Sequence, residues 1–421
     1  MKEGLKILIV GTADTKADEL QFMKRCIQAD GASAAIMDVG VLGKPAFEPD
    51  YANTRVAVAA GTTIEAIAAL GDENEAMKAM AAGAVNLTLS LYKAGEVHGL
   101  LALGGTMGTD LALDVTSALP LGMPKFIVST VAYSHLIPAD RLAPDLMMIL
   151  WAGGLYGLNS VCRSILSQAA GAVMGACSAV VAPGKQRPRV AIGSLGKSCL
   201  SYMVDLNPEL EKRGFEPVVF HCTGMGGRAM ESLIEQGAFV AVFDFALCEL
   251  SNLLRGSVVN AGASRLEAAG RFGIPQIVAP GASDMIDVQS WAPVPAQYEG
   301  RPYHAHNRLI GSVTSTTDER CELARFISGR LNKAKGPTAF LLPRKGIHAW
   351  DLEGQPLHDP DGHKAYVEEF RSSIRSPVKL YDLDLHINDR EFVTKALEVF
   401  DAWMEQGLIP KPARRDAGTQ R

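Results

Sequence analysis

Short apolar runs recur along the whole chain, and each is followed by a glycine-rich turn and a helix-length segment. Residues 5–10 (LKILIV) stop at Gly11 before a helix-like segment at 17–30, and residues 97–103 stop at Gly104-Gly105. Continuous apolar runs of this length are typical of parallel strands that are buried on both faces. Repeated strand–turn–helix units predict parallel sheets joined by right-handed crossovers.

The remaining elements of the first half are expected at 32–37 and 125–128 (strands), 56–70 (a third strand–helix unit), and 73–93 and 158–180 (helices). The alternation restarts in the second half, where strands are expected at 189–192, 217–220, 239–243, 276–279, 338–342 and 378–380. Residues 293–306 show no clear period, which predicts an ordered loop.

A boundary between two domains is expected near the middle of the chain. Residues 182–188 (APGKQRP) hold two Pro and one Gly and show no apolar periodicity, which is typical of a linker. The chain of 421 residues fits two domains, at roughly 100–200 residues each. We therefore predict α/β architecture with two doubly wound, Rossmann-like parallel-sheet domains, at 1–182 and 189–410, followed by a polar tail at 411–421. Ligands of such sheets bind at the carboxyl ends of the strands, so a cleft between the domains is expected.

Composition excludes several functional classes. The 41 Lys and Arg against 46 Asp and Glu give a net charge of −5, so no basic excess favours nucleic acid or an anionic membrane. No uninterrupted apolar stretch reaches about 18 residues, so no membrane span is expected. The seven Cys form no CxxC pair, which argues against a disulfide framework and a Cys-based zinc site. A reducing, cytoplasmic location is expected.

The turn after the first strand is the most informative candidate site. Its residues are Gly11, Thr12, Asp14, Thr15 and Lys16. Backbone N–H groups at the start of the following helix favour an anion, the two hydroxyls and the ammonium add donors, and Asp14 could hold Mg²⁺. The spacing is not that of a P-loop, and helix capping alone is the alternative interpretation.

A second turn has the same character. Adjacent glycines let the backbone approach a ligand closely, and the threonines can donate to phosphate oxygens. The candidate residues are Gly104, Gly105, Thr106, Gly108 and Thr109, together with Ser129 and Thr130 at the end of the neighbouring strand. Tight strand–helix packing is the alternative reason for these glycines.

Two further candidates are weaker. Thr223, Gly224, Gly226 and Arg228 repeat the pattern in the second half, where Arg228 could pair with a phosphate or carboxylate or could simply be solvated. Asp38 ends the second strand, where doubly wound folds often place an acid for a ribose hydroxyl, and a turn role is equally plausible.

Other polar motifs favour ordinary structure. No carboxylate lies at metal-ligand spacing from His304 and His306, which suits loop hydrogen bonds or one ligand contact rather than a metal. Residues 359–363 (DPDGH) resemble a calcium loop only superficially, and a turn before a helix is expected. No GxSxG or HExxH motif is present.

Three segments together resemble the Tm-like ATP-binding domain family, which is named for the N-terminal region of a tomato mosaic virus resistance protein. They are ILIVGTADTKADEL, LLALGGTMGTDLALDV and HCTGMGGRAMESLIEQG, and NAGASRLEAAGRFGIPQIVAPGASDM adds to the match. The resemblance implies two Rossmann-like domains, ATP binding and a homodimer, and it implies no known reaction.

The leading hypothesis is an ATP-binding protein, with Mg²⁺ as a second cofactor, that could transfer a phosphoryl group to a small hydroxylated metabolite. A non-catalytic protein whose cleft closes on nucleotide is one alternative. A hydrolase with a Thr nucleophile is another, for which Lys16 is the only obvious base. The sequence does not decide whether the protein is an enzyme.

Overall fold

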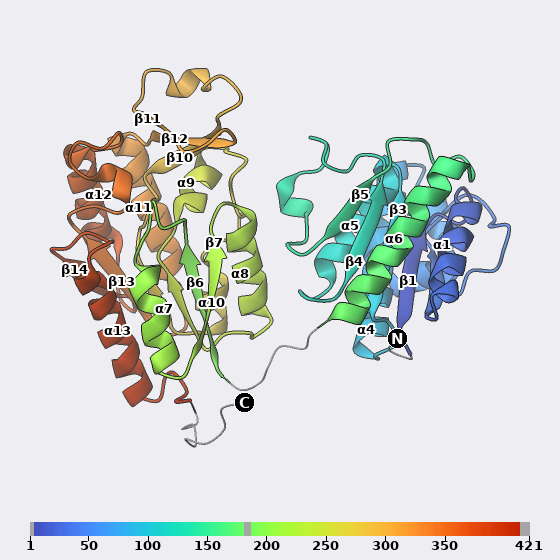
Figure 1. Cartoon of the computed structure of the whole chain (residues 1–421), viewed down its shortest axis with the longest axis horizontal. Helices are drawn as coiled ribbons and strands as arrows, with labels where there is room; N and C mark the ends of the chain where they lie inside the picture. The colour runs from blue at the N-terminus through green and yellow to red at the C-terminus, as the bar shows by residue number, and fades with distance from the viewer. Residues whose placement is uncertain (1–3, 181–186, 413–421) are drawn as a thin grey trace. The chain divides into compact units, whose positions relative to one another are not determined.

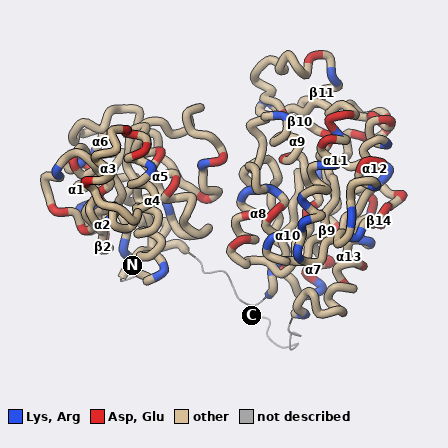
Figure 2. The backbone as a smooth tube through the Cα atoms, turned by 180° about the vertical axis from the view of Figure 1, so that it is seen from behind, with Lys and Arg blue, Asp and Glu red and all other residues tan. Residues whose placement is uncertain are grey.

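The computed structural model describes residues 4–180 and 187–412. It divides into two compact units, Met1–Ala182 and Pro183–Arg421, and each is an α/β domain (Figure 1). The expected linker at 182–188 and the polar tail at 411–421 fall largely outside the described residues. Acidic and basic residues are interspersed along the backbone of both domains (Figure 2).

The N-terminal domain contains a five-stranded parallel sheet in the order β2-β1-β3-β4-β5. Its strands are β1 (Lys6–Gly11), β2 (Ser33–Asp38), β3 (Gly99–Gly104), β4 (Lys125–Ser129) and β5 (Met147–Leu150). β1 pairs with β2 on one side and with β3 on the other. The strand order therefore reverses beside β1: β2 is added on one side of it and β3 on the other. Doubly wound sheets open a crevice for ligands at such a point.

Helices cover both faces of this sheet (Figure 1). Ile7 and Ile9 pack with α1 (Ala17–Ala29) and α6 (Ser160–Ala179), whereas Leu8 and Val10 face the opposite layer. That layer comprises α2 (Asn53–Ala59), α3 (Ile64–Ala68), α4 (Glu73–Lys93) and α5 (Thr106–Ala118), and a short 3₁₀ helix, η1 (Ala139–Arg141), follows β4.

One sequence prediction in this domain is wrong. The strand expected at the start of residues 56–70 is absent, and this region forms α2 and α3 instead. The run VAVAA is too short to separate a strand from a buried helical turn by periodicity. Val56 and Ala57 are buried as neighbours on one side of α2, which is a helical pattern.

The C-terminal domain contains a six-stranded parallel sheet in the order β14-β13-β9-β8-β6-β7. Its strands are β6 (Arg189–Ser194), β7 (Glu216–His221), β8 (Ala241–Asp244), β9 (Gln276–Val278), β13 (Thr338–Pro343) and β14 (Lys379–Leu383). The prediction of two Rossmann-like parallel-sheet domains is thus confirmed.

Two helices, α7 (Met203–Lys212) and α13 (Arg390–Glu405), pack on one face of this sheet. The other face is covered by α8 (Met225–Glu235), α10 (Ala268–Phe272), α11 (Thr317–Leu331) and α12 (Pro360–Ser373). α9 (Cys248–Leu254) lies beside the added sheet described next, and two 3₁₀ helices, η2 (Ala296–Tyr298) and η3 (Ala349–Asp351), complete the domain.

A small antiparallel sheet was not predicted from the sequence. Its strands are β10 (Met285–Gln289), β11 (Tyr303–Ala305) and β12 (Ile310–Thr314), in the order β10-β12-β11. It lies over the carboxyl ends of the parallel strands (Figure 1). These strands are short and mix apolar with polar residues, so they lack the continuous apolar run that marks a buried parallel strand.

Candidate functional site

A pocket of about 430 Å³ lies at the carboxyl edge of the N-terminal sheet. The turn after β1, the loop after β2 and the first turn of α5 contribute to its wall, at Thr12, Gly40 and Gly108. This is the edge beside β1 at which the fold opens a ligand crevice. The first predicted turn therefore reaches this cavity, whereas the second contributes only Gly108 among its candidate residues. The other lining residues come from the same loops and from α3 to α5: Asp14, Thr15, Val39, Val41, Leu42, Ile67, Ala68, Gly71, Asp72, Glu73, Ala76, Met77, Met107 and Leu111.

The first turn presents hydroxyl groups and a carboxylate to this pocket. The hydroxyls of Thr12 and Thr15 lie 2.8 Å apart and share a hydrogen bond. Asp14 Oδ2 accepts a hydrogen bond of 3.2 Å from the Gly43 amide, whereas its Oδ1 is buried without a partner. An unsatisfied buried carboxylate oxygen is costly, so Oδ1 is suited to hold a cation or a donor group. Gly11 serves packing, because a Cβ there would lie 2.8 Å from Leu20.

Lys16 points to another part of the domain. Its ammonium donates a hydrogen bond of 2.6 Å to the Leu155 carbonyl and lies 5.2 Å from the centre of the Tyr156 ring. It is not among the residues that line the pocket. In this structure the Lys16 side chain connects the first turn to the segment before α6 through its hydrogen bond to Leu155. Its role at a phosphate remains a prediction.

Asp38 holds the backbone of the turn after β1 and of the loop after β2 through hydrogen bonds. It is buried, and its Oδ1 accepts hydrogen bonds from the Ala13 and Gly40 amides at 2.8 and 2.9 Å. Burial raises the pKa of this carboxyl, and the two amides act in the opposite direction. Asp38 does not line the pocket, so the structure supports the turn role for this residue rather than a ribose contact.

The second turn divides into packing residues and open residues. A Cβ on Gly104 would lie 2.5 Å from the Gly108 backbone, so Gly104 is required by the close approach of β3 to α5. Thr109 is buried, and its hydroxyl shares a hydrogen bond of 2.7 Å with Ser129. A Cβ on Gly105, by contrast, would meet only Thr130 Oγ1, at 3.9 Å.

Gly105 is the N-cap of α5, and Thr106 is exposed at its first position. The first amides of a helix have no partner within the helix, and its dipole favours an anion there. The lining of the pocket contains no Lys or Arg, and it includes Asp14, Asp72 and Glu73. A phosphate at this place would therefore depend on α5, on hydroxyl donors and on a metal ion.

The third candidate turn, in the C-terminal domain, is already occupied by a side chain of the protein. Glu249 Oε1 accepts hydrogen bonds from the Gly224 and Gly227 amides, at 2.6 and 3.1 Å. Gly224 has a φ of +97°, and a Cβ on Gly226 would lie 1.8 Å from the His221 carbonyl oxygen. Thr223 lines a separate cavity, and Arg228 lies near Gly262. Glu249 thus takes the place that an anionic ligand would have at this turn.

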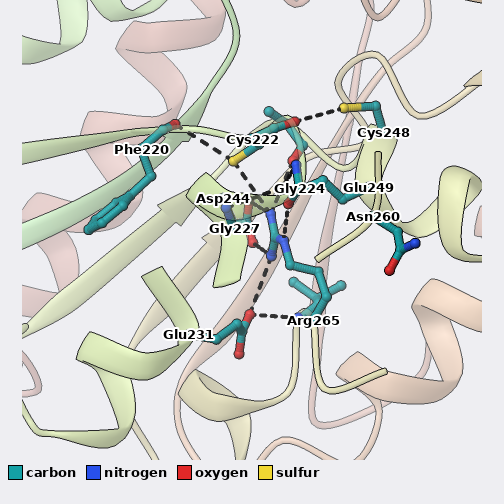
Figure 3. Close-up of polar contacts among 12 residues, drawn as sticks. Phe220, Cys222, Gly224, Gly227, Glu231, Asp244, Cys248, Glu249, Asn260 and Arg265 are labelled. Carbon is teal, nitrogen blue, oxygen red and sulfur yellow. Dashed lines mark hydrogen bonds and ion pairs between the residues drawn. The ribbon is translucent and has the colours of Figure 1, made fainter. Parts of the chain in front are cut away.

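Glu249 belongs to a buried ionic cluster around Arg265 (Figure 3). The guanidinium lies 2.6 Å from Glu249, 2.8 Å from Asp244 and 3.3 Å from Glu231, and all four side chains are buried. Burial raises the pKa values of Glu231 and Glu249, and Arg265 opposes this rise. Sequence reasoning did not single out Arg265, because its partners come from separate segments.

A second buried ion pair lies near the carboxyl ends of β9 and β13. His348 Nε2 is 3.0 Å from Asp284, and Arg320 Nη2 is 3.3 Å from the same carboxylate. Burial alone would raise the pKa of Asp284, but His348 and Arg320 together lower it far below its usual value. Burial would lower the pKa of His348, and the Asp284 carboxylate raises it above its usual value.

We expect this pair to give the protein a pH-dependent stability that Asp284→Asn removes. The depressed pKa of Asp284 stabilises the folded state at pH values above about 4, which is the pKa of an Asp carboxyl in the unfolded chain. The raised pKa of His348 stabilises the folded state at pH values below about 6.5, which is the pKa of histidine in the unfolded chain. The difference in unfolding free energy between wild type and Asp284→Asn should therefore be largest between about pH 4 and pH 6.5. Urea unfolding across this range measures it, and a pH-independent difference would contradict the assignment.

The remaining motifs behave as structural elements. Asp359 caps α12 by accepting a hydrogen bond of 3.0 Å from the Gly362 amide, as expected for a turn before a helix. Within residues 4–180 and 187–412, no group of three or more His, Cys, Asp or Glu side chains could hold a metal ion. No helix in the described part of the chain is long and apolar enough to span a membrane.

The fold and the pocket define a two-domain α/β protein with a cavity at the switch point of its first sheet. The chain belongs to the uncharacterised protein family UPF0261: the family's N-terminal domain matches residues 5–182 and its C-terminal domain matches residues 187–404.

The similarity to related proteins covers nearly the whole chain. A UPF0261 protein of Brucella melitensis is 52% identical over 406 residues, which cover 96% of this chain and 97% of the relative. A UPF0261 protein of Clostridium tetani is 36% identical over 92% of this chain and 96% of its own. The tomato ToMV resistance protein Tm-1 is 29% identical over 94% of this chain but only 55% of its own length, which confirms the resemblance inferred from the motifs. A solved UDP-N-acetylglucosamine 2-epimerase aligns over 99% of this chain and 100% of its own, with 9% identity and a TM-score of 0.23.

Proposed function

We propose that the N-terminal domain binds ATP in the pocket beside β1. The observation that carries this proposal is the convergence of the turn after β1, the loop after β2 and the first turn of α5 on one cavity of about 430 Å³. In open α/β sheets, ligands bind at this position, and a helix start at its edge favours phosphate.

The pocket offers an apolar part and a polar edge. Ile67, Met77 and Leu111 line the apolar part, which suits a nucleobase and its ribose. Thr12 and Thr15 belong to the polar edge. Gly105 does not line the pocket, and it leaves open space at the start of α5, whose first turn does. Phosphates would lie at this edge, where hydroxyls and helix amides act as donors.

Mg²⁺ would offset the acidic lining of the pocket. Asp14 Oδ1 is buried and has no hydrogen-bond partner, and a single carboxylate together with ligand phosphates is a common Mg²⁺ environment. Asp14 is therefore the residue of this chain that would hold the ion, and the ion would supply charge neutralisation at the phosphates.

Within this proposal, the favoured activity is phosphoryl transfer to a small hydroxylated metabolite, and nucleotide-gated binding without turnover is the alternative. Release of inorganic phosphate or of a phosphorylated product would separate the two. A Thr nucleophile is disfavoured, because the Lys16 ammonium that would serve as its base is hydrogen-bonded to the Leu155 carbonyl. The homodimer and the cytoplasmic location also remain predictions.

ATP with Mg²⁺ should raise the melting temperature of the protein. A ligand present at 100 times its dissociation constant stabilises the folded state by about 2.7 kcal/mol. Asp14→Asn should remove most of the Mg²⁺-dependent part of this shift and leave the shift by adenosine unchanged. Differential scanning calorimetry measures both, and an unchanged melting temperature at millimolar ATP and Mg²⁺ would count against nucleotide binding.

A further inference from the structure

The C-terminal domain has a cavity of its own, of about 370 Å³, that none of the preceding roles explains. Its wall is formed by the loop after β6, by the end of β7 and by the small antiparallel sheet, at Gly196, His221 and Val288. The cavity thus lies between the carboxyl ends of parallel strands and the small antiparallel sheet. Figure 1 shows β10, β11 and β12 over these strand ends. Cavities at the carboxyl ends of parallel strands are the usual ligand sites of α/β domains.

The lining offers little to a strongly charged ligand. No Lys or Arg is among the residues that line the cavity, so a phosphate or carboxylate would find no ammonium or guanidinium partner there. The only carboxyl group is that of Asp287, which is 6% exposed. Its oxygens accept hydrogen bonds of 2.7 Å from Ser312 and from Asn252. Burial raises the pKa of this carboxyl, which weakens it further as a partner for a cation.

The accessible polar groups are hydrogen-bonding side chains other than Lys, Arg, Asp and Glu. Ser198, His221, His306 and Asn307 all line the cavity and are exposed, and Thr223 is half-buried beside them. Hydroxyl, amide and imidazole groups can all form hydrogen bonds with the hydroxyl groups of a ligand. Their number is greater than a purely apolar ligand would require.

An aromatic group completes the site. Trp350 lines the cavity, and its ring centre lies 4.1 Å from that of His304 and 5.5 Å from that of His306. Burial lowers the pKa of His304, and His306 and His348 lower it further. The aromatic group therefore adds apolar contact area without charge.

We propose that this cavity binds an uncharged polyhydroxylated small molecule, such as a sugar or a polyol. The neutral donors and acceptors would bind its hydroxyl groups, and Trp350 with Val258 and Leu309 would contact its C–H surface. The site goes beyond the proposed nucleotide function, because it lies within the other domain and uses none of the same residues.

The test uses the full chain without nucleotide, with glucose, ribose, myo-inositol, mannitol and glycerol as uncharged probes and gluconate and glucosamine as charged ones. Binding is followed by the melting temperature and by tryptophan fluorescence, with Trp350→Phe identifying the signal of that residue. We expect at least one uncharged probe to raise the melting temperature and to change the Trp350 signal at millimolar concentration. The corresponding charged probes should bind more weakly.

Two variants locate the site. His221→Ala and His306→Ala remove exposed side chains and should each weaken the bound probe by about three- to tenfold, the usual effect of one lost hydrogen bond. His135→Ala, an exposed histidine of the N-terminal domain, is the matched control and should have no effect. The proposal is overturned if only charged probes bind, if no probe changes the Trp350 signal, or if both histidine variants bind like wild type. None of these outcomes depends on ATP binding.

Discussion

Arg265→Met should destabilise the C-terminal domain by about 3–5 kcal/mol, which is the usual cost of breaking a buried ion pair from one side. The substitution leaves Asp244, Glu249 and Glu231 buried without their cation. Methionine retains most of the volume, so lost packing is a small part of the effect. Urea unfolding at neutral pH measures it, with the midpoint and slope compared to wild type.

Arg271→Met is the matched control, because Arg271 lies in the same domain and forms an exposed pair with Glu235. Exposed pairs contribute about 0–1 kcal/mol, so this variant should stay close to wild type. The Arg265→Met deficit should also shrink as the pH falls, because protonation removes the uncompensated charges. An Arg265→Met protein as stable as the control would mean that the cluster carries no net stabilisation.

Gly105→Val should reduce ATP affinity by at least about tenfold and leave the fold intact, which corresponds to about 1.4 kcal/mol or more. Gly105 has a φ of −70° in the extended region, so valine can adopt its conformation without strain. The branched side chain enters open space, where only Thr130 Oγ1 lies within 4 Å. That space is where the phosphates would approach the start of α5.

Two other glycines make this prediction specific. Gly171 lies on α6 with open space around it, so Gly171→Val should preserve both the fold and ATP binding. Gly104→Val would place a Cβ 2.5 Å from the Gly108 backbone and should destabilise the domain itself. Isothermal titration calorimetry and circular dichroism separate these outcomes. Wild-type affinity in a folded Gly105→Val protein would show that the turn serves packing alone.

The sequence predicted the parallel sheets well because their strands are buried on both faces. The run LKILIV and its turn need no tertiary information, and β1, α1 and the turn between them lie where expected. β5 (MMIL) and the antiparallel strands were missed, because they are short and bounded by irregular segments. Residues 303–305 form β11 only by pairing with β12, which is a contact that periodicity cannot reveal.

The candidate site was predicted in part. The first turn and the start of α5 reach one pocket because parallel strands place their carboxyl ends on one edge. The sequence could not predict the direction in which individual side chains point. The Lys16 ammonium donates a hydrogen bond to the Leu155 carbonyl, 139 positions away in the sequence. The Asp38 carboxylate accepts a hydrogen bond from the Ala13 amide. Glu249 fills the third turn by accepting hydrogen bonds from the Gly227 and Gly224 amides, which precede it in the sequence by 22 and 25 positions.

The most direct test of nucleotide binding is a crystal structure of the full chain with a non-hydrolysable ATP analogue and Mg²⁺. We expect the base between Ile67 and Leu111, the phosphates at Gly105 and the start of α5, and the ion at Asp14. Nucleotide density in another cavity, or an empty pocket beside β1 at saturating analogue, would contradict the proposed function.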